Sequence, residues 1–209
     1  MKREIKAIIF DVGGVLALGE SIIMNGKQRN SVHLYIAKKL NISLDQWFDA
    51  IDTTYAKSIE GKLSEDKVLK IIAKNLKIPI KKLETIVKKS YKKNFKQNKQ
   101  LFKRINNIKK KGYKLAVLSD QWYLSQEALM PKKLYKKFDA VVVSCEVKMR
   151  KPNPKMYKLV LKKLKISPKK ALFIDNQEWN IKPAKRIGMN TILYKNNKQL
   201  FKELSKLEI

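Results

Sequence analysis

The sequence predicts an α/β protein with a parallel sheet and a separate block of helices. Five short apolar runs rich in β-branched residues predict the strands, and helical patterns separate the last four runs. The runs lack the alternation of a half-exposed strand, which is typical of strands buried on both faces. They span residues 5–10, 114–119, 139–144, 171–174 and 190–194. Strand–helix alternation of this kind predicts a parallel sheet with helices on its faces.

Two of the intervening helices have recognisable ends. One pattern runs from Pro154 to Lys165, and proline suits the first turn of a helix. The other runs from Gln177 to Ile187 and is followed by Gly188, a residue typical of helix C-termini.

The interval 31–94 differs, because it contains helical periodicities and no convincing strand. Ser43 begins the capping-box pattern S-L-D-Q, and Ser64 opens another helix. Roughly four helices are expected here, and a single crossover helix would need far fewer residues. We therefore favour a cap beside the sheet over helices that simply cover a sheet face. The predicted division is a core of residues 1–16 and 97–209 and a helical cap of residues 17–96.

Composition excludes several classes of protein. With 209 residues, the chain has room for one ordinary domain, or for a core with a smaller insertion. The one cysteine, Cys145, excludes an intrachain disulfide, and the one histidine, His33, excludes sites built from several imidazoles. No apolar run approaches the length of a membrane span, and the N-terminus lacks a signal-peptide pattern, so we expect a soluble cytoplasmic protein.

The charge is strongly basic, with 48 Lys and Arg against 18 Asp and Glu and a net charge of +30. Such a charge raises the hypothesis of a nucleic-acid partner. However, the lysines are scattered over nearly every helix-like segment, and the chain contains no nucleic-acid motif. We favour a lysine-rich surface, which would still concentrate anionic ligands.

Polar and charged side chains follow four of the predicted strands. In open parallel sheets, functional groups collect where the carboxyl ends of the strands meet loops, so these side chains are expected to face one crevice. Each alone is weak evidence, but all of them in order are much harder to dismiss. They are Asp11, Ser119, Asp120, Lys151, Asp175 and Asn176.

Four segments carry a resemblance to a known family. They are IIFDVGGVL (8–16), VLSD (117–120), SCEVKMRKPNPKMY (144–157) and FIDNQEWNIKPAKRIGMNTILYKN (173–196). The segments resemble the four motifs of the haloacid dehalogenase superfamily, in particular its helical-cap subgroup and the small sugar-phosphate phosphatases within it. This resemblance implies a Rossmann-like core, hydrolase activity and, most simply, a Mg²⁺-dependent phosphatase of small phosphorylated metabolites.

The resemblance also implies roles for individual residues. Asp11 would attack the substrate phosphorus and form an aspartyl-phosphate. Ser119 would hydrogen-bond the phosphoryl oxygens, and Lys151 would offset the charge of nucleophile and phosphate. Gly14 would let the chain bend sharply beside the phosphate.

A metal site is implied as well. Asp11, Asp175, Asn176 and the backbone carbonyl of Gly13 would hold Mg²⁺, which prefers oxygen ligands, with Glu178 as a further helper.

Two positions depart from the family pattern. The phosphatases usually carry an Asp two residues after the nucleophile as general acid and base, and here that position is Gly13. General acid–base catalysis is typically worth about 10²–10⁴-fold, so another group such as Asp120 would have to substitute. The subgroup usually has a second acid where this chain has Asn176, which implies weaker metal affinity.

These departures leave three hypotheses open. The first is the Mg²⁺-dependent phosphatase, acting as a monomer or homodimer. The second is a metal-independent dehalogenase-like hydrolase, which Asn176 and Trp179 favour. The third is a degenerate family member that binds phosphate ligands or nucleic acid without catalysis.

Structural roles are the alternative for several residues. Asp120 is as well suited to capping a helix as to catalysis. His33 is expected on the surface or on a cap helix, and Cys145 is expected as a small core residue. The three tryptophans are expected to pack hydrophobically, and Trp122 has the further option of lining the pocket. They are Trp47, Trp122 and Trp179.

Overall fold

The computed structural model describes residues 4–19, 21–24 and 27–209, and side chains are described outside residues 20–31. A five-stranded sheet with the strand order β7-β6-β1-β8-β9 forms its centre. Every neighbouring pair in this sheet is parallel, as predicted. The strands are β1 (Ala7–Phe10), β6 (Lys114–Ser119), β7 (Ala140–Val143), β8 (Ala171–Asp175) and β9 (Asn190–Leu193). Each lies within one or two residues of its predicted run, which confirms the predicted α/β class with a five-stranded parallel sheet.

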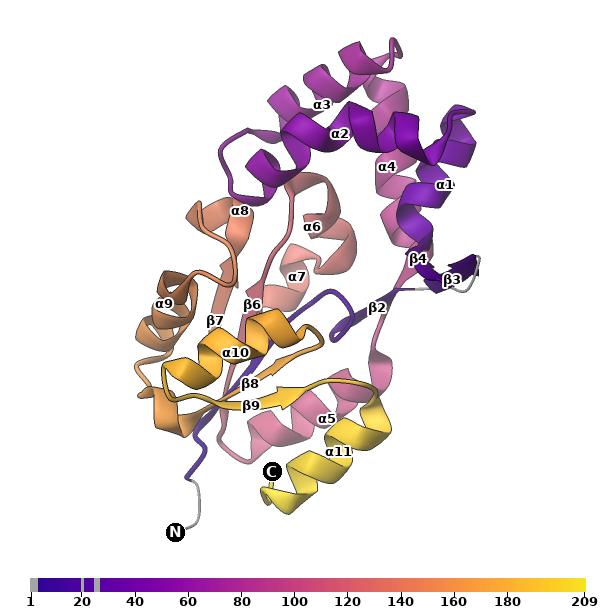
Figure 1. The fold of residues 1–209 in the computed structure, drawn as a ribbon. Helices are drawn as coiled ribbons and strands as arrows, with labels where there is room; N and C mark the ends of the chain where they lie inside the picture. The colour runs from indigo at the N-terminus through magenta and orange to yellow at the C-terminus, as the bar shows by residue number, and fades with distance from the viewer. Residues whose placement is uncertain (1–3, 20, 25–26) are drawn as a thin grey trace.

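Helices cover both faces of the sheet (Figure 1). Helices α5 (Lys99–Lys110) and α11 (Asn197–Lys206) pack on one face, where Leu101 and Leu200 join an apolar cluster with the sheet. Helices α9 (Pro154–Leu164) and α10 (Glu178–Arg186) pack on the other face around Tyr157. Because both faces are covered, β1 and β8 are buried along their whole length, which explains their unbroken apolar sequences.

The predicted helical block lies apart from this sheet (Figure 1). Four helices form it, and they pack around their own apolar cluster, which includes the fully buried Trp47 and Leu83. Ser43 completes the expected capping box with Gln46, and Ser64 precedes a helix as expected. The helices are α1 (Ser31–Leu40), α2 (Leu44–Ile59), α3 (Glu65–Asn75) and α4 (Ile80–Asn94).

Two short antiparallel strand pairs that the sequence did not predict occur where the chain enters and leaves the block. Strand β2 (Ala17–Gly19) pairs with β5 (Phe95–Gln97), and β3 (Ser21–Met24) pairs with β4 (Lys27–Asn30). Asn98 strengthens the junction, because its side chain donates to the Val15 carbonyl at 2.9 Å. The two connections to the block therefore lie side by side, next to the loop that follows β1.

Shorter elements complete the loops on the carboxyl side of β6 and β7 and before β8. They are α6 (Tyr123–Leu129), α7 (Lys132–Tyr135), α8 (Ser144–Val147) and the 3-10 turn η1 (Pro168–Lys170). None of the described helices is both long enough and apolar enough to cross a membrane.

The aromatic predictions have mixed outcomes. Trp47 and Trp122 are buried, and Trp122 Nε1 donates to the Tyr91 hydroxyl at 2.9 Å, which ties the sheet domain to α4. Trp179 was predicted to pack hydrophobically, and this is wrong: it lies in the first turn of α10 and is 62 % exposed. The helix buries its other face instead, through Ile181 and Ala184.

His33 and Cys145 have the structural roles that the sequence favoured. His33 lies on α1, and its Nδ1 accepts a hydrogen bond from Trp47 Nε1 at 2.8 Å. Burial lowers the pKa of His33 to about 4, so the ring is neutral at pH 7. Cys145 is buried, and burial raises its pKa, so it is not an activated thiol.

Candidate active site

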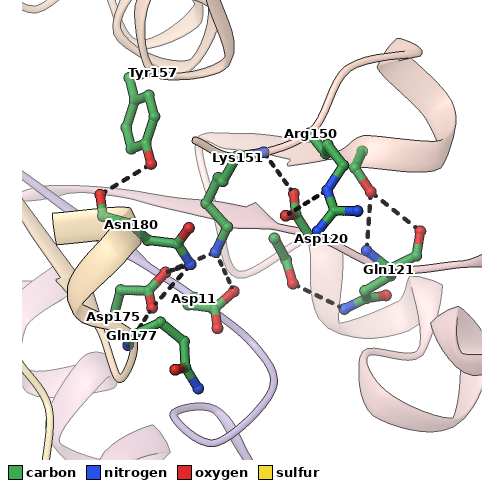
Figure 2. A network of polar contacts seen from close by, with 11 residues as sticks. Asp11, Asp120, Gln121, Arg150, Lys151, Tyr157, Asp175, Gln177 and Asn180 are labelled. Carbon is green, nitrogen blue, oxygen red and sulfur yellow. Dashed lines mark hydrogen bonds and ion pairs between the residues drawn. The ribbon is translucent and has the colours of Figure 1, made fainter. Parts of the chain in front are cut away.

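Three buried charged side chains meet at the carboxyl edge of the sheet (Figure 2). The Lys151 ammonium lies 2.9 Å from Asp11 Oδ1 and 2.7 Å from Asp175 Oδ2. Asp11 follows β1 and Asp175 ends β8, and these two strands are direct neighbours in the sheet. The packing of adjacent parallel strands therefore brings both carboxylates to one lysine. The sequence predicted that these groups face one crevice, but not that Lys151 pairs with both carboxylates.

Asp175 is held from several sides. Its Oδ1 accepts from the backbone N–H of Gln177 at 2.8 Å, and both of its oxygens accept from Asn180 Nδ2 at 3.3 and 3.1 Å. The Asn180 carbonyl in turn accepts from the Tyr157 hydroxyl at 2.9 Å. Together with Lys151, these donors make four contacts with the two oxygens of the Asp175 carboxylate. A carboxylate has about four acceptor positions, so little capacity remains for a further ligand.

The electrostatics of the cluster favour charged groups at neutral pH. Burial raises the pKa of Asp11 to about 6, although the neighbouring Lys151 partly opposes this rise. Burial alone would lower the pKa of Lys151, but Asp11, Asp175 and Asp120 outweigh it and raise that pKa. Asp11 is therefore mostly ionised at pH 7, which a carboxylate nucleophile requires.

Ser119 ends β6 and is buried beside this cluster. Its Oγ accepts a hydrogen bond from Gln121 Nε2 at 3.3 Å. The Gln121 backbone is fixed in turn, because its N–H donates to Ser144 Oγ at 3.0 Å. Because Oγ is the acceptor toward Gln121, the hydroxyl hydrogen remains available for donation to another acceptor.

Asp120 supports the loop that carries Lys151. Its Oδ1 accepts from the Lys151 backbone N–H at 2.9 Å, and its Oδ2 lies 3.8 Å from Arg150 Nε. The alternative of helix capping is wrong, because α6 begins after Trp122 and Asp120 makes no cap bond to it. Burial raises the pKa of Asp120, although Lys151 opposes that shift.

The two glycines after Asp11 behave differently. Gly14 has a φ of +84°, and a Cβ there would lie 2.4 Å from Asn176 Nδ2. Glycine is thus required for the turn and for the approach of Asn176. At Gly13, an added Cβ would meet no atom within 4 Å, so the space that an acid would occupy is open.

The residues present fit a magnesium ion in part. The Asn176 side-chain oxygen is buried and has no hydrogen-bond partner in the described part of the chain, as expected of an oxygen that awaits a ligand. Asp11 adds a carboxylate, and the Gly13 carbonyl lies in the same loop. Asp175 contributes less, because its acceptor positions are filled. Glu178 points away, since it is exposed and pairs with Lys182 at 3.4 Å.

Three contributing residues were missed from the sequence. Asn180 lies within the quoted motif, and its place in the first turn of α10 was a usable signal, because that turn folds back on the end of β8. Gln121 and Arg150 each adjoin a predicted residue, but their contacts depend on tertiary packing.

The parallel sheet thus brings a buried carboxylate, a hydroxyl and a lysine from separate strands and loops to one edge, where active sites of such folds lie. A model of the haloacid dehalogenase-like hydrolase family matches residues 5–188. The chain therefore belongs to this family of hydrolases.

Individual relatives agree with this assignment. Bifunctional epoxide hydrolase 2 of Rattus norvegicus is 34% identical over 115 residues, which is 53% of this chain and 21% of that protein. The phosphorylated carbohydrates phosphatase of Thermotoga maritima is 27% identical over 188 residues, which is 90% of this chain and 83% of that one. The chain spans under a third of the length of the epoxide hydrolases that it matches.

A solved structure supports the fold. The HAD family enzyme of Bacteroides thetaiotaomicron, in complex with magnesium and inorganic phosphate, superposes with a TM-score of 0.74 at 20% identity. The match covers 94% of this chain and 99% of that chain.

Proposed function

We propose that the protein is a phosphatase of small phosphorylated metabolites that works through an aspartyl-phosphate on Asp11. The observation that carries the proposal is the buried Asp11–Lys151–Asp175 cluster at the carboxyl edge of β1 and β8. The relatives lend support, because one of them is a phosphatase of phosphorylated carbohydrates and a structural neighbour holds magnesium and phosphate.

Asp11 is the nucleophile in this proposal. Its carboxylate attacks the phosphorus, the P–O bond to the leaving alcohol breaks, and the phosphoryl group is carried on Asp11 until water hydrolyses the acyl phosphate. Ser119 donates its hydroxyl hydrogen to a phosphoryl oxygen. The Lys151 ammonium offsets the repulsion between carboxylate and phosphate, which is the main barrier to this attack. Asp175 and Asn180 hold that ammonium in place.

Magnesium would be held by Asp11, the Gly13 carbonyl and Asn176. When bound, the ion neutralises charge on the transferring phosphoryl group. Asp175 serves to hold Lys151 more than to ligate the ion, because its oxygens already make four contacts with three donors. A site with Asn176 in place of an acid has one negative charge fewer and is expected to bind the ion weakly.

Proton transfer to the leaving group is assigned to Asp120. Gly13 has no side chain for this task. Burial raises the pKa of Asp120, which is the direction that a general acid requires. The same carboxylate keeps its bond to the Lys151 backbone, so Asp120 also positions the lysine.

We further propose that the helical block is a cap over the site. The turn between α2 and α3 lies against α8, since a Cβ at Gly61 would lie 2.2 Å from the Cys145 carbonyl oxygen. Tyr55 on α2 contacts Trp122 at a ring-centroid distance of 5.0 Å, directly after the segment that carries Ser119. Such a cap would exclude water from the reacting groups.

Phosphate release from a panel of sugar phosphates, nucleotides and phosphoglycolate tests the proposal. The panel is run with Mg²⁺ and with a chelator. We expect turnover that requires Mg²⁺ at millimolar concentration. No release from any member by the folded protein would reject the phosphatase.

A metal-independent hydrolase is the second candidate. The four contacts to Asp175 and the absence of charge on Asn176 favour it, because Asp11 is then the main charged ligand among the residues proposed to hold the ion. Full activity under chelation, or halide release from 2-haloacids, would select this candidate. Complete loss of activity under chelation would exclude it.

A further inference from the structure

An open groove of about 550 Å³ lies between the helical block and the loop that carries Lys151. One wall is the turn after α2, with Glu60 and Lys62. The other wall is the 148–153 loop. The groove thus runs along the loop whose Lys151 side chain reaches inward to the buried Asp11. It is therefore the region that the non-reacting part of a substrate would occupy.

The charge of the groove is strongly positive. Four cationic residues line it against one carboxylate residue, Glu60. Lys62 is paired with Glu60, and Lys151 is paired with Asp11 and Asp175. Among the described residues, Lys148 has no ion pair, and Arg150 has one long ion pair with Asp120, at 3.8 Å. An anionic group placed between them would replace solvent as their partner.

Arg150 is the better placed of these two. Within the described residues its side chain makes one ion pair, and Nε lies 3.8 Å from Asp120 Oδ2, beyond hydrogen-bond distance. Most of its five N–H donors are thus available for a planar anion. Figure 2 shows Arg150 beside Asp120, while Asp175 and Asn180 lie on the other side of Lys151. The guanidinium therefore stands at the outer edge of the catalytic cluster.

Close contact between the Gly61 turn and the backbone of α8 fixes the position of one wall of the groove relative to the other. Gly61 has a φ of +63°, and any side chain there would collide with the Cys145 carbonyl oxygen, so the turn can press directly against α8. The field of Arg150 also reaches across the groove, where it adds to the effect of Lys62 in lowering the pKa of Glu60. The groove therefore lies where the helical block contacts the core.

We infer that this groove binds a second anionic group of the substrate, with Arg150 as its main partner. The inference rests on the proposed phosphatase function and narrows its substrates to phosphate esters that carry a further carboxylate or phosphate. Arg150 is a specificity-determining residue, because it contacts the part of the substrate that does not react.

The test uses pairs of esters that differ in one anionic group. Ethyl phosphate is compared with phosphoglycolate, which adds a carboxylate, and fructose 6-phosphate with fructose 1,6-bisphosphate, which adds a phosphate. The first pair tests whether the groove accepts a carboxylate, and the second pair tests whether it accepts a phosphate. We measure kcat/KM for each, and also the binding of each to Asp11→Asn by calorimetry, which requires no turnover.

Three substitutions complete the design. Arg150→Met removes the charge and the N–H donors. Arg150→Lys keeps the charge but removes the planar arrangement of guanidinium donors. Arg186→Met is the matched control, because Arg186 is exposed at the far end of α10. We expect the wild type to prefer the doubly anionic ester by about tenfold, which corresponds to about 1.4 kcal/mol. Arg150→Met should abolish this preference mainly through KM, Arg150→Lys should keep part of it, and Arg186→Met should keep all of it.

The outcomes separate this inference from the proposed function. Hydrolysis of simple esters without a preference, or a preference that survives Arg150→Met, would overturn the groove assignment and leave the phosphatase standing. Arg150-dependent binding without hydrolysis would support the groove and reject the phosphatase. Neither binding nor hydrolysis would reject both.

Discussion

The candidate site has two halves that differ in how completely their polar groups are paired. The inner half, formed by Asp11, Lys151, Asp175 and Asn180, is buried and densely hydrogen-bonded. In the described part of the chain, the outer half, formed by Gly13, Asn176 and Arg150, contains an open space, an unpaired oxygen and a guanidinium whose one ion pair is 3.8 Å long.

The difference separates two tasks. A densely hydrogen-bonded buried network favours one arrangement, so the inner half can hold the nucleophile in a fixed position. Unpaired groups are costly unless a ligand or solvent satisfies them, so the outer half is suited to binding. The chemistry is thus expected to depend on the inner half, and metal affinity and substrate choice on the outer half.

The largest effect is expected from breaking the inner half. Asp11→Asn keeps the size of the side chain but removes the nucleophile, and we expect phosphatase activity to fall about 10⁴-fold or more. Phosphate release and thermal unfolding are measured together, with the exposed Asp52→Asn on α2 as the matched control. A folded Asp11→Asn protein with most of its activity would refute the mechanism.

The open space at Gly13 gives the next largest effect. Gly13→Asp would add a carboxylate at a position where an added Cβ meets no atom within 4 Å, so there is room for the start of the side chain. We expect kcat to rise about 10²-fold, at the lower end of what a general acid–base contributes. Gly13→Ala is the control, because it fills the same space without a proton donor. Equal activities of the two variants would show that the outer half does not lack an acid.

A smaller gain is expected at Asn176. Asn176→Asp adds a negative charge at the unpaired oxygen, and we expect Mg²⁺ to bind about tenfold more tightly. Calorimetric titration of Mg²⁺ checks this directly, and Asn107→Asp on the exposed face of α5 adds the same charge far from the site. Unchanged affinity in Asn176→Asp would place the metal elsewhere or exclude it.

The smallest change comes from pH. The pKa of Asp11 is about 6, and the protonated carboxyl cannot attack phosphorus. Because ionised Asp11 is required, kcat/KM should fall about tenfold for each pH unit below this pKa. A pH–rate profile with an acid limb near pH 4 would instead show that Lys151 or a bound metal outweighs burial.

Much of the fold followed from local sequence. The strands were predicted within one or two residues because β1, β6 and β8 are buried on both faces and read as unbroken apolar runs. The four helices of the block followed from their periodicity and from the capping box at Ser43. The short pair β2–β5 was not predicted, because three-residue strands have no periodicity of their own.

The sequence by itself determined which residues reach the site. Asp11, Ser119, Lys151 and Asp175 were identifiable because the carboxyl ends of parallel strands converge, whatever the details of packing. The pairing among them was decided by the tertiary structure, since Lys151 and Asp11 are 140 positions apart in the chain. The exposure of Trp179, the bonds that saturate Asp175 and the groove beside Arg150 arise in the same way. Each depends on how elements that are far apart in the chain pack together. A local pattern of residues does not determine the distance between such elements.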